Sequence, residues 1–378
     1  MLTVEQSKEL VARGFSRRNF GRLATMFAAG STLPFMNESA MAQLSMVKDM
    51  PADAVKIDAN ENPMGPCADA LEAIHRCAAN GGRYMYQETF NMTETLAEQE
   101  GLKPSYVKAY PGSSAPLHQA VLAFCSPTKP FVMADPGYEQ GAGAARYLGA
   151  KTIRVPLMKD YSHDVKAMVA ASPDAGLIYI CNPNNPTGTI TKKSDIEWAI
   201  ANKPKGSVIM VDEAYYHLAG ISPLSDAVAA DKDVVILRTF SKIYGMAGIR
   251  AGVAMGRPDL LEKVGAFTAG ALPTTGMAAA TASLKNKTLV PERREKIKII
   301  REENLAFLEK HGYKTVPSVS NKFMVDTRRP AAEVIAALRK EKVYIGRPWP
   351  VWPTSVRVSV GTKDEMAKFQ AAWLKVMA

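Results

Sequence analysis

The chain has 378 residues, of which 47% are hydrophobic and 22% are charged. This composition is that of a folded enzyme and excludes a disordered or fibrous chain. No apolar run reaches the roughly 20 residues that cross a bilayer as a helix, which excludes a polytopic membrane protein. The net charge of +10 suits anionic small molecules. Nucleic-acid binding is not expected, because no zinc-ligand spacing, helix-turn-helix signal or basic run with interleaved aromatics occurs.

The N-terminus carries the pattern of a twin-arginine export signal. Arg17 and Arg18 precede a mildly apolar stretch at residues 23–35, and Ala-Met-Ala ends at Ala42. The pattern predicts cleavage after this alanine and a periplasmic protein with no membrane contact once the signal is removed. An amphipathic N-terminal helix or a basic arm is the alternative.

Short β-branched runs alternate with helical patterns from about residue 110 to residue 260. Such alternation predicts an α/β fold with a parallel sheet between helices. The expected strands lie at residues 130–134, 151–155, 176–181, 208–212, 234–239 and 251–255. Because open α/β sheets bind ligands beyond the carboxyl ends of their strands, we expect the chemistry in the loops that follow.

The pattern changes after about residue 275. A long charged helix is expected at residues 290–311, followed by strand, helix, strand and a terminal helix from about Lys363, which indicates a smaller α+β domain. The predicted organisation is a signal peptide at 1–42, a segment joining the small domain at 43–75, a large domain at 76–275 and a small domain at 276–378.

Two of the loops after predicted strands carry polar side chains that could bind a ligand. Residues 182–188 read Asn-Pro-Asn-Asn-Pro-Thr-Gly, in which prolines and glycine can hold an asparagine amide rigidly, although a structural turn would use similar residues. Asp212 ends the next buried strand, where a carboxylate is costly unless it meets a cation or strong donors. Its alternative role is an N-cap for the following helix.

The third loop, residues 238–250, places Lys242 directly after a strand. A lysine just inside a core has a depressed pKa and can supply a neutral amine for imine formation. Hydroxyls, backbone amides and Arg250 can together hold a phosphate. A surface loop with casual charges is the alternative, which the presence of all three loops in one chain disfavours.

Together these motifs resemble the fold-type I pyridoxal-phosphate enzymes, specifically the histidinol-phosphate aminotransferase group of the class I and II aminotransferases. They are Asn-Pro-Thr-Gly at 185–188, Asp-x-x-Tyr at 212–215, Ser-Lys at 241–242 and the distal Arg250. The resemblance extends from about residue 55 to the C-terminus. It implies a mostly parallel seven-stranded sheet in the large domain, pyridoxal 5'-phosphate as cofactor and no metal.

The resemblance also implies roles for single residues at the cofactor. Lys242 would hold it as a Schiff base and later move a proton, and Asp212 would pair with its ring nitrogen. Tyr215 and Asn185 would hydrogen-bond its phenolic oxygen, and Tyr138 would stack on its ring. The cofactor phosphate would be held by Gly112, Ser113, Ser114, Thr239, Ser241 and Arg250.

Further residues are implied at the substrate and at a second subunit. Arg357 matches the arginine that holds the substrate carboxylate, which a guanidinium binds bidentately. Asn60 belongs to a segment that covers the site, and Arg347 matches an arginine that binds the substrate phosphate in histidinol-phosphate enzymes. Tyr86 matches a tyrosine that reaches the cofactor phosphate from the other subunit of a homodimer. A core tyrosine is the alternative.

Two features depart from the pattern of the group. The phosphate loop at residues 112–116 reads Gly-Ser-Ser-Ala-Pro and lacks two acidic residues. Arg347 is followed by Pro-Trp-Pro-Val-Trp-Pro, in which Trp349 and Trp352 indicate either an aromatic, apolar or cation-stacking pocket or a packed loop. Export also argues against a role in histidine synthesis.

The sequence therefore predicts a homodimeric aminotransferase that passes the amino group of an L-amino acid to a 2-oxo acid. Another reaction of the same cofactor, such as decarboxylation of a phosphorylated amino acid or oxidative deamination, is one alternative. A non-catalytic binding protein that has kept the fold is the other. The four cysteines are expected as free thiols, with a Cys67–Cys77 disulfide as the alternative.

Overall fold

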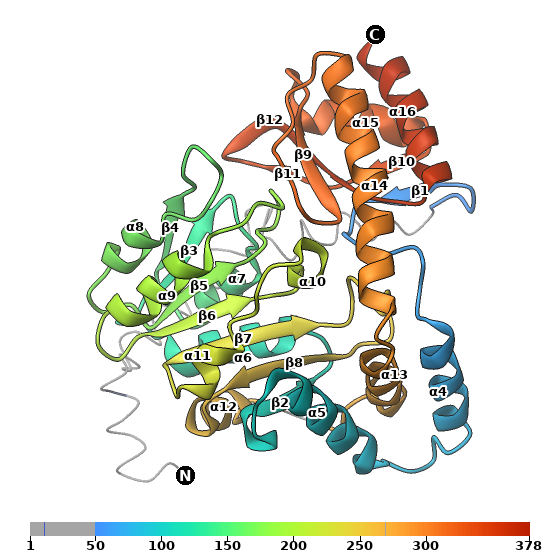
Figure 1. Cartoon of the computed structure of the whole chain (residues 1–378). Helices are drawn as coiled ribbons and strands as arrows, with labels where there is room; N and C mark the ends of the chain where they lie inside the picture. Colours follow the sequence, from blue (N-terminus) through green and yellow to red (C-terminus); the bar gives the residue numbers. More distant parts are fainter. Residues whose placement is uncertain (1–10, 12–49, 269) are drawn as a thin grey trace.

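The computed structural model describes Val11 and residues 50–268 and 270–378, and the predicted export signal lies outside the described residues (Figure 1). A larger domain built on one sheet and a smaller domain above it make up this part of the chain. Among the described residues, no helix is both long enough and apolar enough to cross a bilayer.

The sheet of the larger domain has seven strands in the order β2-β8-β7-β6-β5-β3-β4. Neighbours are parallel except where β8 pairs with β2 and with β7. The strands are β2 (Val107–Tyr110), β3 (Phe131–Asp135), β4 (Thr152–Pro156), β5 (Leu177–Cys181), β6 (Val208–Asp212), β7 (Val234–Thr239) and β8 (Gly252–Gly256). The predicted α/β class and mostly parallel sheet are confirmed.

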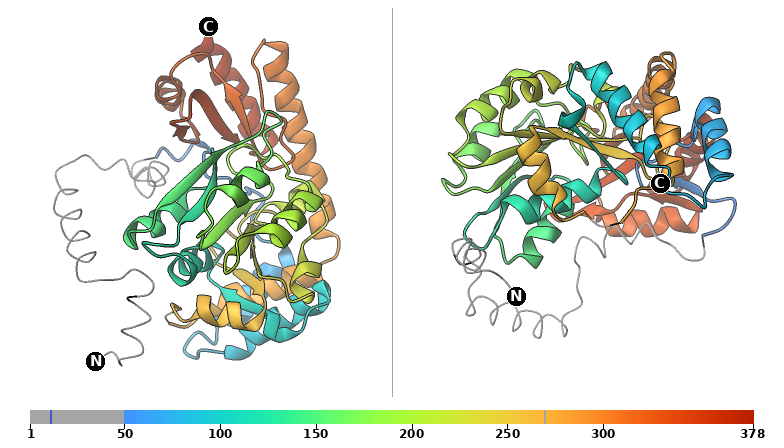
Figure 2. Two further views of the ribbon diagram at one scale, coloured as in Figure 1. Left: turned by 90° about the vertical axis from the view of Figure 1, so that its left-hand side faces the viewer. Right: turned by 90° about the horizontal axis from the view of Figure 1, so that it is seen from below.

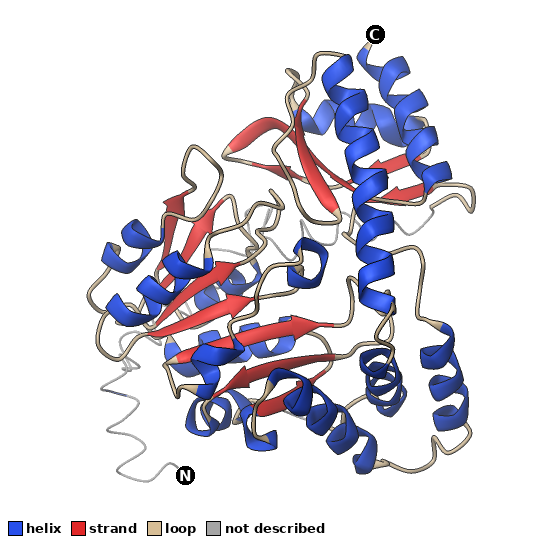
Figure 3. Ribbon diagram, viewed as in Figure 1, coloured by secondary structure: helices blue, strands red, loops and turns tan. Residues whose placement is uncertain are grey.

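The central strands are recognisable in the sequence because both faces of the sheet are covered. Every residue of β5, β6 and β7 is buried, and buried parallel strands read as continuous apolar runs. Helices surround the strands in Figure 3, and two views in Figure 2 show them on both sides of the sheet. They are α6 (Ser114–Phe124), α7 (Gln140–Tyr147), α8 (Val165–Ala170), α9 (Lys193–Asn202), α10 (Tyr216–Ala219), α11 (Ser225–Ala229) and α12 (Pro258–Gly265).

The smaller domain contains two short sheets and three helices. Its antiparallel sheet has the order β11-β12-β9, and β1 pairs in parallel with β10, which joins the N-terminal segment to the C-terminal part of the chain. The strands are β1 (Val55–Ile57), β9 (Lys322–Asp326), β10 (Val343–Ile345), β11 (Pro348–Trp349) and β12 (Trp352–Ser359). The helices are α14 (Leu289–Lys310), α15 (Ala331–Lys340) and α16 (Lys363–Met377). The long helix expected at residues 290–311 agrees with α14 to within one residue.

Three helices pack together at the end of the molecule opposite the small domain (Figure 1). They are α4 (Ala68–Ala78), α5 (Tyr86–Glu100) and α13 (Thr274–Lys285), followed along the chain from α5 by the short 3-10 helix η2 (Pro104–Tyr106). The boundaries expected at residues 75 and 275 cut through α4 and α13, because helical periodicity does not indicate which part of the molecule a helix packs against.

All four cysteines are free thiols. Cys77, Cys125 and Cys181 are buried, and Cys67 is half-buried. The expectation of free thiols rather than a disulfide agrees with the structure.

Candidate active site

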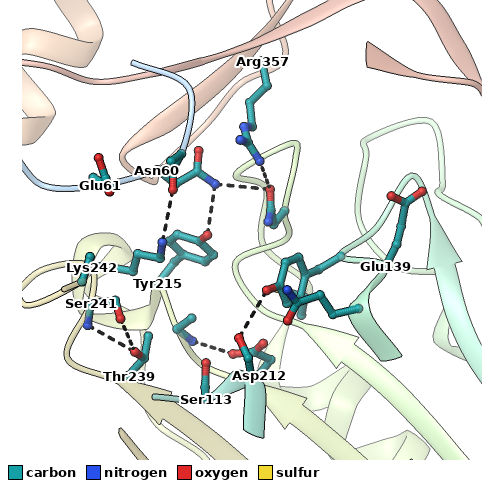
Figure 4. A pocket seen from close by; sticks show the side chains of 18 of the residues that line it. Asn60, Glu61, Ser113, Glu139, Asp212, Tyr215, Thr239, Ser241, Lys242 and Arg357 are labelled. Atoms are coloured by element: carbon teal, nitrogen blue, oxygen red, sulfur yellow. Dashed lines mark hydrogen bonds between the residues drawn. The ribbon is translucent and has the colours of Figure 1, made fainter. Parts of the chain in front are cut away.

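A pocket of about 280 Å³ lies at the carboxyl ends of β5, β6 and β7, where the N-terminal segment and the small domain approach the sheet (Figure 4). A volume of this order suits a small organic ligand. All predicted site residues except Gly112 and Tyr86 line it. They are Asn60, Ser113, Ser114, Tyr138, Asn185, Asp212, Tyr215, Thr239, Ser241, Lys242, Arg250, Arg347 and Arg357.

Lys242 follows β7 and projects into this pocket as a nearly unpartnered amine. Its Nζ reaches only the carbonyl oxygen of Ala59, at 3.5 Å, in the part of the chain that the structure describes. Burial lowers the pKa of Lys242 to about 8, and the Arg357 guanidinium adds to this effect while Glu61 opposes it. A fraction of neutral amine is therefore available near neutral pH, which imine formation requires.

Asp212 ends β6 and is 2% exposed. The hydroxyl of Tyr179 donates to its Oδ2 at 2.8 Å, and the backbone amide of Ala214 donates to its Oδ1 at 3.1 Å. Burial nevertheless raises the pKa of Asp212 to about 6. The hydrogen bond from Ala214 closes a local turn. Asp212 is not the N-cap of the following helix, because α10 begins only at Tyr216. Within the described residues Asp212 forms no ion pair, although Lys242 and Lys322 act on it at longer range. A protonated ring nitrogen would supply a cation in direct contact.

A hydrogen-bonded chain runs across the pocket from the N-terminal segment to β12 (Figure 4). Asn60 Nδ2 donates to the Tyr215 hydroxyl at 3.1 Å and to Asn185 Oδ1 at 3.4 Å. Arg357 Nη1 donates to the same Asn185 oxygen at 3.0 Å, and its Nη2 donates to the carbonyl oxygen of Asp58. Arg357 Nε is buried without a hydrogen-bond partner among the described residues. Two hydrogen bonds therefore fix this guanidinium at the wall of the pocket, where its charge suits a substrate carboxylate.

The predicted phosphate site gathers hydroxyls, a guanidinium and a helix N-terminus. Thr239 Oγ1 donates to Ser241 Oγ at 2.8 Å, and Arg250 Nη1 donates to the same oxygen at 3.4 Å. Gly112 has φ +95°, and a Cβ there would collide with the Arg250 guanidinium. Glycine thus lets the backbone close on Arg250 just before α6, whose N-terminus favours an anion. The two acidic residues of the group's pattern are absent here, but the hydroxyls and the arginine of the predicted phosphate site are present and lie together.

Two predicted aromatic residues lie in different surroundings. Tyr138 lines the pocket, its hydroxyl is 3.5 Å from Ser114 Oγ, and burial raises its pKa to about 12. Tyr86 is 59% exposed at the start of α5 and stacks on Tyr84 with ring centroids 5.5 Å apart. It is outside this pocket, and its predicted contact with a second subunit stays a prediction.

Arg347 is already paired within the chain. Its Nη2 donates to Glu139 Oε2, and the other oxygen of this 4% exposed carboxylate lies 3.6 Å from Arg154 Nη1. The Arg347 guanidinium also lies over the ring of Trp349, 4.2 Å from its centroid. Trp349 is 1% exposed and Trp352 packs edge-on against a neighbouring tyrosine ring, so the packed loop is the alternative that the structure bears out.

Several residues at the site escaped the sequence analysis. Glu139 directly follows Tyr138, and adjacency to that motif was the only signal for it. Tyr179 lies within a buried strand and reads as part of an apolar run. The residues that line or support the site without having been predicted include Glu61, Glu139, Gln140, Tyr179, Cys181 and Lys322.

Comparison with known proteins agrees with this geometry. The family described as aminotransferase class I and II matches residues 52–372. A histidinol-phosphate aminotransferase of Moorella thermoacetica is 32% identical over 86% of this chain and 86% of its own length. An aromatic amino acid aminotransferase of Cutibacterium acnes is 30% identical over 83% and 90%. The structure of histidinol-phosphate aminotransferase from Sinorhizobium meliloti in complex with pyridoxal-5'-phosphate has a TM-score of 0.80 at 26% identity, covering 92% and 96%.

The raised pKa of Asp212 gives a prediction for the cofactor-free protein. Between about pH 4 and pH 6 the folded protein keeps a proton that the unfolded chain has lost, so ionised Asp212 costs stability at higher pH. Asp212→Asn should therefore raise the free energy of unfolding above pH 6 by up to about 3 kcal/mol, and this gain should vanish near pH 4. Urea unfolding across this pH range measures the effect.

In the presence of pyridoxal 5'-phosphate the wild type should become the more stable of the two proteins, because Asp212→Asn lacks the negative charge predicted to pair with the ring nitrogen. We expect weaker cofactor binding and a smaller thermal shift on cofactor addition. Asp174→Asn, at an exposed position, is the control and should change neither property. A variant that loses stability without cofactor yet binds it as tightly as the wild type would contradict the assignment.

Proposed function

The chain belongs to the class I and II aminotransferases and is a pyridoxal-phosphate-dependent transaminase. We propose that its amino donor is an L-amino acid or related amine whose side chain carries no net charge. The observation that carries this proposal is the ion pair between Arg347 and Glu139. Arg347 is the residue predicted to bind a substrate phosphate, and its charge is already matched by a carboxylate that lines the same pocket.

The charges around this pair add to zero. Arg154 Nη1 lies 3.6 Å from Glu139 and 3.8 Å from Asp135, so two guanidinium groups face two carboxylates. A phosphate that pairs with Arg347 would compete with Glu139 for this guanidinium, and weakening a buried ion pair costs free energy. An uncharged side chain enters without this cost.

An uncharged polar side chain stands next to Glu139 at this pocket. Gln140 lines the pocket, and its Oε1 is buried without a partner among the described residues. The names of the relatives include both a histidinol-phosphate and an aromatic amino acid aminotransferase. The paired Arg347 favours the second kind of donor, with an aromatic or neutral polar side chain.

The residues of the chain divide the work of transamination among them. When bound, pyridoxal 5'-phosphate supplies an electron sink that weakens the Cα–H bond of the amino acid. Arg357, whose side chain lines the pocket, attracts the α-carboxylate and orients Cα, first in the amino acid and then in the 2-oxo acid. Lys242 Nζ takes up the Cα proton, which its pKa of about 8 permits. Asp212 would supply the negative charge that a protonated ring nitrogen needs. Asn60 Nδ2 donates to the Tyr215 hydroxyl and so holds it in place.

The proposed donor class is tested by Glu139→Gln. This change keeps the shape of the side chain and frees the Arg347 charge for an anion. The wild type should transfer the amino group of phenylalanine or another uncharged donor better than that of histidinol phosphate. In the variant, kcat/KM for histidinol phosphate relative to phenylalanine should rise roughly tenfold, which corresponds to about 1.4 kcal/mol.

Stopped-flow absorbance of the cofactor in a single turnover gives both rates without a choice of acceptor. Glu61→Gln removes a carboxylate of the same pocket that has no ion pair with Arg347, and it should leave the ratio of the two donors unchanged. A wild-type enzyme that uses histidinol phosphate better than every uncharged donor would show that the Arg347–Glu139 pair opens for phosphate.

We also propose a homodimer with shared active sites. Three aromatic side chains near the start of α5, those of Tyr84, Tyr86 and Phe90, are 68%, 59% and 55% exposed, and such a group is a common interface feature. Sedimentation should give twice the mass of one chain. Tyr86→Ala should weaken cofactor binding more than Tyr84→Ala does, whereas a monomer with full cofactor affinity would exclude the shared site.

Export to the periplasm is a further proposal, supported by the order of the arginine pair, the apolar stretch and the Ala-Met-Ala site. Replacing Arg17 and Arg18 together by lysine should retain the full-length protein in the cytoplasm. Cell fractionation with mass spectrometry of the N-terminus measures this. The wild type should begin at Gln43, and uncleaved wild-type protein confined to the cytoplasm would exclude export.

A further inference from the structure

A second lysine, Lys322, is buried beside the transamination site. It is the first residue of β9 and is 0% exposed. Its Nζ donates to Ser320 Oγ at 3.0 Å and lies 3.1 Å from the centre of the Tyr215 ring. Neither contact is a carboxylate, and Lys322 forms no ion pair within the described residues. Charge pairing therefore does not explain why a lysine is buried at this position.

Packing does not supply that reason. The three residues after Lys322 are Phe323, Met324 and Val325, and all are buried and apolar. Burying a polar amine costs free energy, and an apolar side chain of similar length would fill the space without that cost. A lysine at this position therefore works against stability.

The charged and titratable groups that act on Lys322 come from several elements. Burial is the first cause that holds the pKa of Lys322 well below its usual value. Arg357 of β12 and Lys242 after β7 lower it further, whereas Cys181 of β5 and Asp212 of β6 raise it. Two neighbouring cations thus favour an uncharged amine, which can approach both an aromatic face and a hydroxyl without a counterion.

The contact joins the small domain to Tyr215, the residue predicted to hydrogen-bond the cofactor. Tyr215 comes from the loop after β6, and its hydroxyl is held by Asn60 Nδ2 at 3.1 Å. Lys322 contacts the ring of Tyr215 from the small domain, and Lys242 Nζ lies 5.7 Å from the centre of the same ring. A shift of the Tyr215 ring would therefore move its hydroxyl within the pocket that Lys242 also lines.

We propose that Lys322 is a positioning residue of the transamination site, which fixes the ring of Tyr215 and thereby the hydroxyl that faces the cofactor. Lys322 acts through Tyr215 and does not line the pocket itself. The proposal rests on transamination at this site and on the assigned role of Tyr215, and it is independent of the proposed donor class.

A double-mutant cycle of Lys322→Met and Tyr215→Phe tests this proposal. Lys322→Met should leave the unfolding temperature of the cofactor-free protein unchanged or raise it, because the cost of the buried amine is removed. Its kcat should fall by about tenfold to a hundredfold, the usual effect of misplacing a catalytic group, with little change in KM. In the Tyr215→Phe background the same substitution should have no further effect on kcat, because the hydroxyl that Lys322 positions is absent.

A second readout needs no amino donor. The pH titration of the cofactor absorbance in the loaded enzyme should shift in Lys322→Met in the same direction as in Tyr215→Phe. A wrong assignment of the donor class would leave this result intact. If the wild type showed no cofactor absorbance after loading, the assigned transaminase chemistry would instead be overturned.

Phe323→Leu is the matched control, since it perturbs the same strand from the adjacent core position. It should lower the unfolding temperature but keep the wild-type absorbance titration. The proposal is wrong if Lys322→Met keeps both wild-type kcat and titration, or if it lowers kcat equally with and without the Tyr215 hydroxyl. It is also wrong if Lys322→Met and Lys322→Gln both fail to fold, because a structural role would then explain the buried amine.

Discussion

The arrangement of this site depends on one constraint, the burial of the Asp212 carboxylate at the end of a central strand. Within the described residues its hydrogen-bond partners are a phenol and one backbone amide, and it forms no ion pair. Burial raises its pKa despite these two hydrogen bonds. The strands on either side deliver Asn185 and Lys242 to the same edge, because parallel neighbours end together. A ligand whose positive ring nitrogen pairs with Asp212 would therefore lie near the Lys242 amine and near the predicted phosphate site at Ser241 and Arg250, because the sheet fixes the distances between these groups.

Much of this could be read from the sequence, for a physical reason. Buried strands such as β6 are continuous apolar runs, and the polar residue that ends each run must lie at the sheet edge. Strand positions were therefore accurate to one residue, and the loops after them contained the site. The strand β2 was not predicted, because four residues are too few to show a hydrophobic period. The packing of α4 against α13 was not predicted either, because a helical period does not indicate which element the helix packs against.

The pairing of charges could not be predicted in the same way. Arg357 and Arg347 are ten residues apart and both line the pocket. Within the described residues Arg357 forms no ion pair, whereas Arg347 is paired with Glu139. The difference comes from a carboxylate more than 200 residues earlier in the chain. Lys322 was missed for a related reason, because a lysine that begins a strand normally reads as a surface residue, and only the fold places it against Tyr215.

The site concentrates ionisable groups whose burial opposes folding, and this links cofactor binding to stability. Asp212, Lys242 and Lys322 all have pKa values shifted toward the uncharged form by burial. A ligand that supplies the missing cation and anion binds only the folded protein, and such a ligand stabilises that state by mass action. The proposed export route gives this coupling a use, because the twin-arginine pathway carries folded proteins. A chain loaded in the cytoplasm would cross the membrane in its more stable, cofactor-bound form.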